Sequence, residues 1–127
     1  MAKTFAIIFG AVFVLVGLMG FLDTPLVGMD GLFQTDTLHD LVHLIIGVVL
    51  LLVAFTAPEK SSKWLIIFGF VYLALVVLGF LLIPGGGELL GLVTMNHADH
   101  WLHVVLAGAL LAVGYMTRGN NTRGSIA

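Results

Sequence analysis

All five histidines of the 127-residue sequence fall in two short segments. His39 and His43 are four residues apart in the first, and Asp99 and His103 have the same spacing in the second. On a helix, side chains four residues apart lie on one face. If the two pairs converge, three imidazoles and one carboxylate form a four-ligand set. Such nitrogen and oxygen donors suit Zn, Cu, Fe or Mn, so these four residues are the candidate metal ligands.

Two other interpretations of His43 and His103 stay open. Each histidine could give one axial nitrogen to a tetrapyrrole such as haem or chlorophyll. Gly47 and Ala107, one turn further along, would then leave room for the macrocycle, although helix packing also explains such small residues. Alternatively, the imidazoles serve only in hydrogen bonds between helices. Both histidines lie about one turn inside an apolar segment, where an ionisable group is costly and is a functional candidate.

The other three histidines lie nearer the water. His39 is expected at the membrane interface, where a solvated histidine costs little. His97 and His100 are expected to be surface residues, because the start of their helix is in contact with water. His43 and His103 are therefore the principal candidates for a cofactor or metal.

The carboxylates beside the histidines also have a structural explanation. Thr37 with Asp40, and Asn96 with Asp99, match capping boxes, in which a carboxylate reaches back to a free amide at the start of a helix. Asp99 could instead orient His103 as a hydrogen-bond acceptor. Capping is the expected role of both carboxylates.

The composition indicates where these helices lie. The chain is 60% hydrophobic and 9% charged, with mean hydropathy +1.15, against about 45–50% and about 25% in soluble domains. Long apolar blocks are typical of membrane spans, so the partner is a lipid bilayer. A soluble enzyme and a disordered chain are excluded. Five Lys and Arg in a chain of net charge −2 give no surface for nucleic acid, and the absence of cysteine excludes disulfides and thiolate sites.

Uncharged runs predict four spans, each near the roughly 17–25 residues that cross a bilayer. They are residues 5–22, 41–57, 64–83 and 101–116. All five Lys and Arg then fall on one side, and loops rich in these residues stay in the cytoplasm. Both termini are therefore expected to be cytoplasmic, with the histidines near the outer face.

The two halves of the chain resemble each other. Ile-Ile-Phe-Gly at residues 7–10 recurs at residues 66–69, and His43 matches His103 sixty residues later. Such self-similarity predicts an all-α fold, a four-helix transmembrane bundle made of two parallel two-span repeats. The expected division of this single membrane domain is repeat 1 over about 1–57, repeat 2 over about 60–117, and an unstructured cytoplasmic tail over 118–127.

The loops at the histidine side are unusual for solvated linkers. Residues 26–33 and 85–93 mix glycine with large apolar side chains. They are expected to pack against the end of the bundle, as a cap, or to lie as shallow loops in the headgroup region, where polar partners satisfy irregular backbone. The first and third spans carry no charged residue, which argues against an ion path. No catalytic constellation is found, so the chain is not expected to be an enzyme.

The histidine segments resemble a known family. Leu-His-Asp-Leu-Val-His-Leu at residues 38–44, and Asp-His-Trp-Leu-His at residues 99–103, are similar to the paired motifs of DUF4383, a family of small bacterial four-span proteins of unknown function. The chain departs from that pattern at Asp40 and His100, where the family has asparagine. The resemblance covers nearly the whole chain and implies a bacterial inner or photosynthetic membrane, with no activity attached.

Two functional hypotheses follow. In the first, a non-enzymatic membrane protein holds a metal ion or tetrapyrrole near its outer face through His43 and His103, with His39 and Asp99 assisting. In the second, the chain is a structural or accessory subunit of a larger membrane complex, or a homo-oligomer, and its histidines only form hydrogen bonds. An enzyme with a metal-bound water ranks third.

Overall fold

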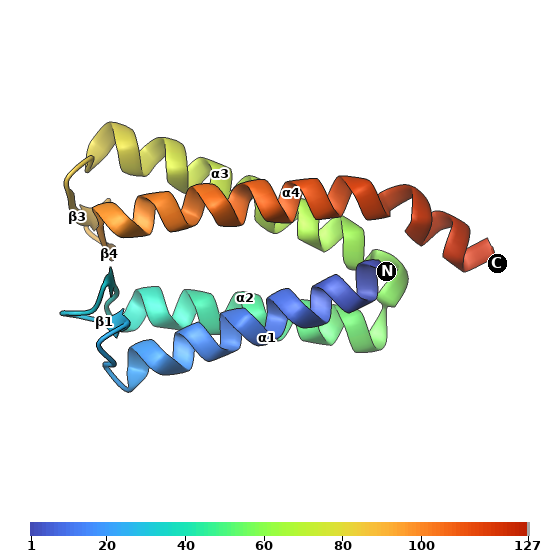
Figure 1. Ribbon diagram of the computed structural model, residues 1–127, viewed down its shortest axis with the longest axis horizontal. Helices are drawn as coiled ribbons and strands as arrows, with labels where there is room; N and C mark the ends of the chain where they lie inside the picture. Colours follow the sequence, from blue (N-terminus) through green and yellow to red (C-terminus); the bar gives the residue numbers. More distant parts are fainter. Residues whose placement is uncertain (127) are drawn as a thin grey trace.

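The long apolar runs without internal proline form four helices, and the computed structural model describes residues 1–126, with side chains over residues 1–118. All four helices are long and apolar enough to cross a membrane. They form an up-and-down bundle, as Figure 1 shows, and confirm the predicted fold class. The helices are α1 (Ala2–Phe21), α2 (Thr37–Thr56), α3 (Ser61–Leu82) and α4 (His97–Ile126).

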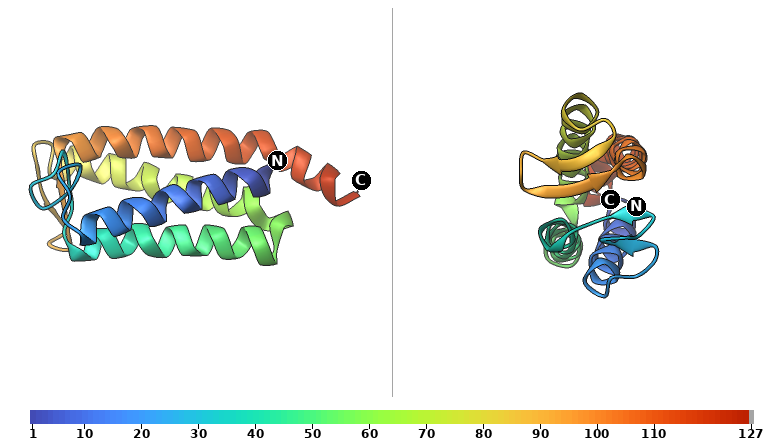
Figure 2. Two further views of the ribbon diagram at one scale, coloured as in Figure 1. Left: turned by 60° about the horizontal axis from the view of Figure 1, so that its bottom comes forward. Right: turned by 90° about the vertical axis from the view of Figure 1, so that its left-hand side faces the viewer.

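Both long loops cover one end of the bundle, which we call the hairpin end (residues 22–36 and 83–96) (Figures 1 and 2). The first loop holds a short parallel pair, β1 (Val27–Gly28) and β2 (Phe33–Gln34), and the second an antiparallel hairpin, β3 (Gly86–Leu89) and β4 (Val93–Asn96). The N-terminus and the turn η1 (Pro58–Lys60) lie at the opposite end. The expected packing of the apolar loops against the bundle is therefore observed.

Equivalent residues of the two halves make equivalent contacts. A Cβ atom on Gly10 of α1 would lie 2.9 Å from Leu51 Cγ of α2, and one on Gly69 of α3 would lie 2.7 Å from Leu111 Cγ of α4. Small residues at these positions let the two helices of each half approach closely. Each half is thus a helix pair with the same seam.

The two halves meet around a pair of stacked rings. Phe13 of α1 and Tyr72 of α3 have ring centroids 5.5 Å apart with an interplanar angle of 19°. They occupy matching positions in the two halves, 59 residues apart. The buried core around them also includes Ile46, Leu50, Leu65, Ala107 and Leu110. Large apolar side chains on the outer faces of all four helices remain exposed, which fits a lipid environment.

Gly47 belongs to the α1–α2 seam. A Cβ atom there would lie 2.7 Å from both Gly10 O and Val14 N, which are backbone atoms of α1. The contacts support the helix-packing explanation of Gly47, since α1 fills the space that a macrocycle would need.

The Gly47→Ala substitution is expected to destabilise the folded protein by about 1–3 kcal/mol, because α1 must move away from α2. Thermal unfolding in detergent, followed by circular dichroism, measures the loss. Gly108→Ala is the matched control, because no atom lies within 4 Å of the position that its new methyl group would take. Equal melting temperatures for both variants would contradict the close packing of α1 against α2 at Gly47.

The end of the chain differs from expectation. Helix α4 continues to Ile126, whereas the sequence predicts an unstructured tail from residue 118. The prediction of irregular structure there is wrong for residues up to 126. Once a helix is established, each further residue adds one hydrogen bond, and the glycines of this segment weaken the helix without ending it.

Candidate functional site

Three histidines from two helices meet beneath the hairpin end. His39 and His43 project from one face of α2, and His103 projects from α4. One ligand atom from each lies within 4.8 Å of the others, and all three residues are buried. The ring centroids are 4.6 Å apart for His39–His43 and 5.8 Å apart for His39–His103. We call these three residues the histidine cluster.

A metal ion fits between these rings with small side-chain movements. Zn–N bonds of about 2.0–2.1 Å in a tetrahedral site place the nitrogens about 3.4 Å apart. Ligand atoms within 4.8 Å of one another therefore need to move inward by less than about 1 Å each. Three imidazoles would leave the fourth position open.

The loop of the second half fixes the orientation of His39. His39 Nδ1 lies 2.8 Å from the backbone oxygen of Thr94, which only accepts hydrogen bonds. The proton is therefore on Nδ1, and the Nε2 lone pair is free for a metal. This arrangement, a ligand imidazole donating its other N–H to a carbonyl, is usual at metal sites.

Asp36 joins Thr94 to the start of α2. Its Oδ1 accepts a hydrogen bond of 2.8 Å from the backbone N–H of His39, and its Oδ2 accepts from the N–H and hydroxyl of Thr94, at 3.1 and 2.9 Å. Asp36 is thus the N-cap of α2. The predicted Thr37–Asp40 capping box is wrong, because the carboxylate one residue before Thr37 already reaches the free amide.

Hydrogen bonds make Asp36 a stronger acid. Partial burial raises the pKa of its carboxyl, but the hydrogen bonds from His39 and Thr94 favour the charged form and bring the pKa below its ordinary value of 3.8. A carboxylate of depressed pKa stabilises the fold above pH 3.8, and this contribution is lost as the pH falls through the lower folded value.

The Asp36→Ala variant is therefore expected to be less stable at pH 7 by about 0.5–2 kcal/mol, the usual effect of removing an N-cap. The difference from the unsubstituted protein should shrink as the pH falls below 3.8. Melting temperatures of both proteins between pH 7 and pH 3 check this, with the exposed Asp30→Ala as control. A difference that stays constant over that range would contradict the role of the charged cap.

His43 and His103 lack the hydrogen bonds that a structural role requires. Both ring nitrogens of His103 and Nδ1 of His43 are buried without a hydrogen-bond partner among the described residues. His103 is 0% exposed. Buried polar atoms are nearly always hydrogen-bonded, so unpaired ones call for an explanation such as an ion. A metal ion bound between these imidazoles would accept the nitrogen lone pairs and so give the buried nitrogens a partner.

Asp99 lies outside the histidine cluster. One of its oxygens accepts from Asn96 N–H at 2.8 Å, while Asn96 Oδ1 accepts from Asp99 N–H at 2.9 Å. This reciprocal pair confirms the predicted capping box at the start of α4. The carboxylate is 1% exposed and serves the backbone of its own helix.

The remaining histidines differ from each other. His97 is exposed, as predicted, and its Nε2 accepts from Trp101 Nε1 at 3.0 Å. The predicted surface position of His100 is wrong, because this residue is 0% exposed. It packs against Gly79 and donates from Nε2 to the backbone oxygen of Ile83 at 2.6 Å, so it holds the end of α3.

A cavity of about 170 Å³ borders the histidine cluster. Two of its lining residues, Tyr72 and Met95, carry an oxygen or sulfur atom and are not among the sequence candidates. Tyr72 is 1% exposed, its ring lies 5.1 Å from that of His103, and its hydroxyl has no hydrogen bond in the described part of the chain. Met95 of β4 brings a thioether. The internal repeat offers a signal for Tyr72, since it matches Phe13 at the same depth. The lining residues are His39, Val42, His43, Val71, Tyr72, Leu75, Val93, Met95 and His103.

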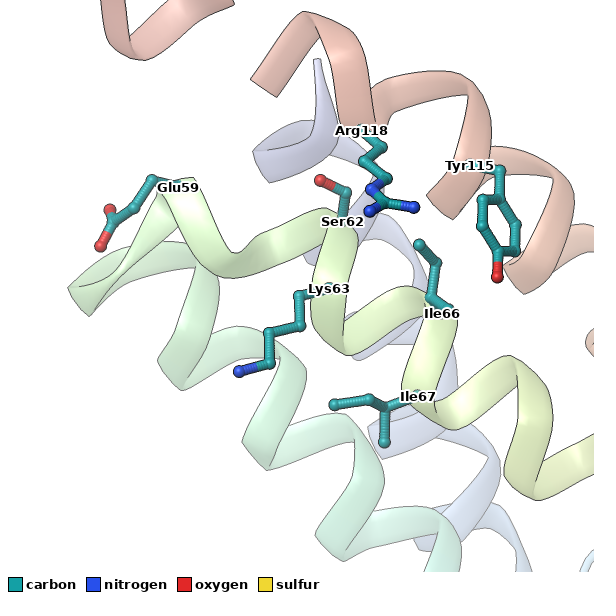
Figure 3. A pocket seen from close by; sticks show the side chains of 7 residues that line it. All are labelled: Glu59, Ser62, Lys63, Ile66, Ile67, Tyr115 and Arg118. Carbon is teal, nitrogen blue, oxygen red and sulfur yellow. The ribbon is translucent and has the colours of Figure 1, made fainter. Parts of the chain in front are cut away.

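A larger cavity, of about 400 Å³, lies at the opposite end between α3 and α4 (Figure 3). Lys63 and Arg118 border it together with Glu59 and Ser62. No histidine lines it. The larger cavity is therefore separate from the candidate metal centre.

Comparison with known proteins finds one family. No curated protein and no solved structure matches the chain. One family model, described as a domain of unknown function (DUF4383), matches residues 3–116, which include all four spans and the histidine cluster. The chain therefore belongs to the DUF4383 family.

Proposed function

We propose that this protein binds one transition-metal ion of the zinc or copper class through His39, His43 and His103. The observation that carries the proposal is the set of buried imidazole nitrogens that face each other without hydrogen bonds. Neutral imidazole is a good ligand for both metals. Burial without a partner costs free energy in the metal-free protein, and a bound ion would remove that cost.

The size of the adjoining cavity favours an ion over a tetrapyrrole. Pockets for small molecules usually exceed about 300 Å³. The cavity beside the histidines is about 170 Å³. The room beside Gly47, where a macrocycle could have fitted, is occupied by α1. Met95 in the cavity wall offers a soft thioether, a ligand type that favours Cu(I).

The position of the site suggests a role at the outer face of the membrane. The structure describes the side chains of four of the five Lys and Arg residues. All four lie at the end opposite the hairpins: Lys3, Lys60, Lys63 and Arg118. With that end in the cytoplasm, the histidine cluster lies just below the outer surface. The protein would then hold a metal ion there without catalysing a reaction.

Equilibrium dialysis of the detergent-solubilised protein against Zn²⁺ and Cu⁺ tests the proposal. We expect about one ion per chain, and a large loss of affinity in His39→Gln. His97→Gln is the matched control, since this exposed histidine lies at the same end outside the cluster. Equal binding by both variants, or no binding by the unsubstituted protein, would contradict the proposal. A Soret or chlorophyll absorption band would favour the tetrapyrrole.

A further inference from the structure

The cavity at the end opposite the hairpins has both charged and apolar walls (Figure 3). One side is formed by η1 and the start of α3, and the other by residues 115–118 of α4. Its volume of about 400 Å³ is within the range of about 300–1,000 Å³ that is usual for pockets of small molecules. We call it the basic cavity.

The charged residues of the basic cavity lie at the end of the bundle. Lys63 and Arg118 bring two positive charges against the one negative charge of Glu59, so the lining has a net charge of +1. In Figure 3 the side chain of Arg118 extends from α4 toward α3, where Ser62 lies. Ser62 is only 3% exposed and adds a hydroxyl to the lining. Guanidinium, ammonium and hydroxyl groups all donate hydrogen bonds to phosphate, so this end favours a phosphate with a single negative charge.

The apolar residues of the basic cavity lie deeper in the membrane spans. On α3, Ile66 and Ile67 follow Lys63 by three and four residues. On α4, Tyr115 precedes Arg118 by three residues. Because α3 and α4 are antiparallel, both steps lead away from the charged end, as Figure 1 shows. Ile67 and Tyr115 are 36% and 49% exposed, so this wall is accessible to the acyl chains of the bilayer.

The two walls of the basic cavity are held together by a close contact between their helices. A Cβ atom on Gly114 of α4 would lie 2.6 Å from Ile66 Cγ1 and 3.3 Å from the backbone oxygen of Ser62, both on α3. Small residues let membrane helices approach in this way. The contact fixes the spacing of the helices that carry Lys63 and Arg118.

We propose that the basic cavity binds one anionic phospholipid of the phosphatidylglycerol class. Its phosphodiester would lie between Lys63 and Arg118, and an acyl chain would follow Ile67 and Tyr115. The single negative charge of this lipid balances the net charge of the lining, and its apolar chain matches the deeper wall. Basic pockets between membrane helices on the cytoplasmic side bind anionic headgroups by the same physics. The proposal does not depend on a metal in the histidine cluster.

Two related ligands fit the basic cavity less well. Phosphatidylcholine carries the same phosphodiester, but its trimethylammonium group adds a positive charge beside two cations. Inorganic phosphate has no apolar part to cover the wall formed by Ile67 and Tyr115. The proposal therefore predicts a preference for the anionic lipid over both.

Native mass spectrometry of the full-length protein in detergent, titrated with dioleoylphosphatidylglycerol, counts the bound lipids and measures their affinity. We expect one tightly bound lipid per chain. Lys63→Gln and, separately, Arg118→Gln should each weaken binding about fivefold, the contribution of one Lys or Arg near an anionic surface. Both residues are exposed, so the variants should fold. Lys60→Gln is the matched control, because it removes the same charge from the same end outside the cavity, and it should bind normally.

Parallel titrations with dioleoylphosphatidylcholine and with inorganic phosphate complete the test. We expect each to bind at least about fivefold more weakly than the anionic lipid. Equal affinity for the two lipids would overturn the proposal, and so would equal affinity for inorganic phosphate, which would indicate a site for free anions. An equal loss of affinity in Lys60→Gln would also overturn it, as an effect of diffuse charge at this end of the bundle.

Discussion

In metal-free detergent, the His103→Leu variant is expected to be more stable than the unsubstituted protein by about 1–3 kcal/mol. His103 is fully buried, and neither of its nitrogens has a hydrogen-bond partner among the described residues. Leucine is apolar and of similar size, so it fills the space without the cost of burying unpaired polar atoms. A gain in stability on removal of a buried residue is typical of a residue kept for binding.

His100→Leu is the matched control for this prediction. His100 is equally buried and its Nδ1 is also unpaired among the described residues, but its Nε2 donates to Ile83 O at 2.6 Å, whereas neither nitrogen of His103 has a partner. Its replacement leaves that carbonyl unpaired and is expected to cost about 1–3 kcal/mol. Thermal or denaturant unfolding of both variants, after treatment with EDTA, measures the two changes. If His103→Leu is destabilised as strongly as His100→Leu, His103 has a structural role and the metal-site interpretation fails.

Zn²⁺ at about one hundred times its dissociation constant is expected to raise the free energy of unfolding by about 2.7 kcal/mol. The effect arises because the ion binds the folded histidine cluster and not the separated ligands. Substitution of ligands should remove it. The double variant His43→Gln/His103→Gln is expected to lose more than about 100-fold in affinity, since changes in the residues around metal ligands alone cost 10–100-fold.

Melting curves with and without Zn²⁺ measure this stabilisation. His97→Gln keeps all three cluster histidines and should retain the full shift. A shift of the same size in the double variant would mean that Zn²⁺ binds elsewhere, and would contradict the assignment of His43 and His103 as ligands.

The sequence predicts the helical architecture well, because each apolar run has the length of a membrane span and no internal proline. The convergence of His39, His43 and His103 also follows from four-residue spacing and the internal repeat. These are consequences of helical periodicity and of the symmetry between the halves. The exact limits of the two repeats, 1–57 and 60–117, stay a prediction.

The loops cannot be predicted in the same way. The roles of Asp36 and Thr94 depend on a contact between residues 58 positions apart, which no local pattern specifies. Met95 lines the cavity beside the histidine cluster only because β4 folds over the bundle end (Figure 2). The sequence misplaces His100 because its partner is the backbone oxygen of Ile83, and a backbone acceptor has no signature in side-chain spacing.

Elemental analysis of the protein purified in mild detergent from its native membrane, together with an absorption spectrum, tests most directly whether the histidine cluster holds a metal ion. We expect about one zinc or copper ion per chain, no tetrapyrrole band, and loss of the ion in His43→Gln/His103→Gln. A colourless, metal-free protein that purifies with a larger membrane assembly would contradict metal binding by the histidine cluster.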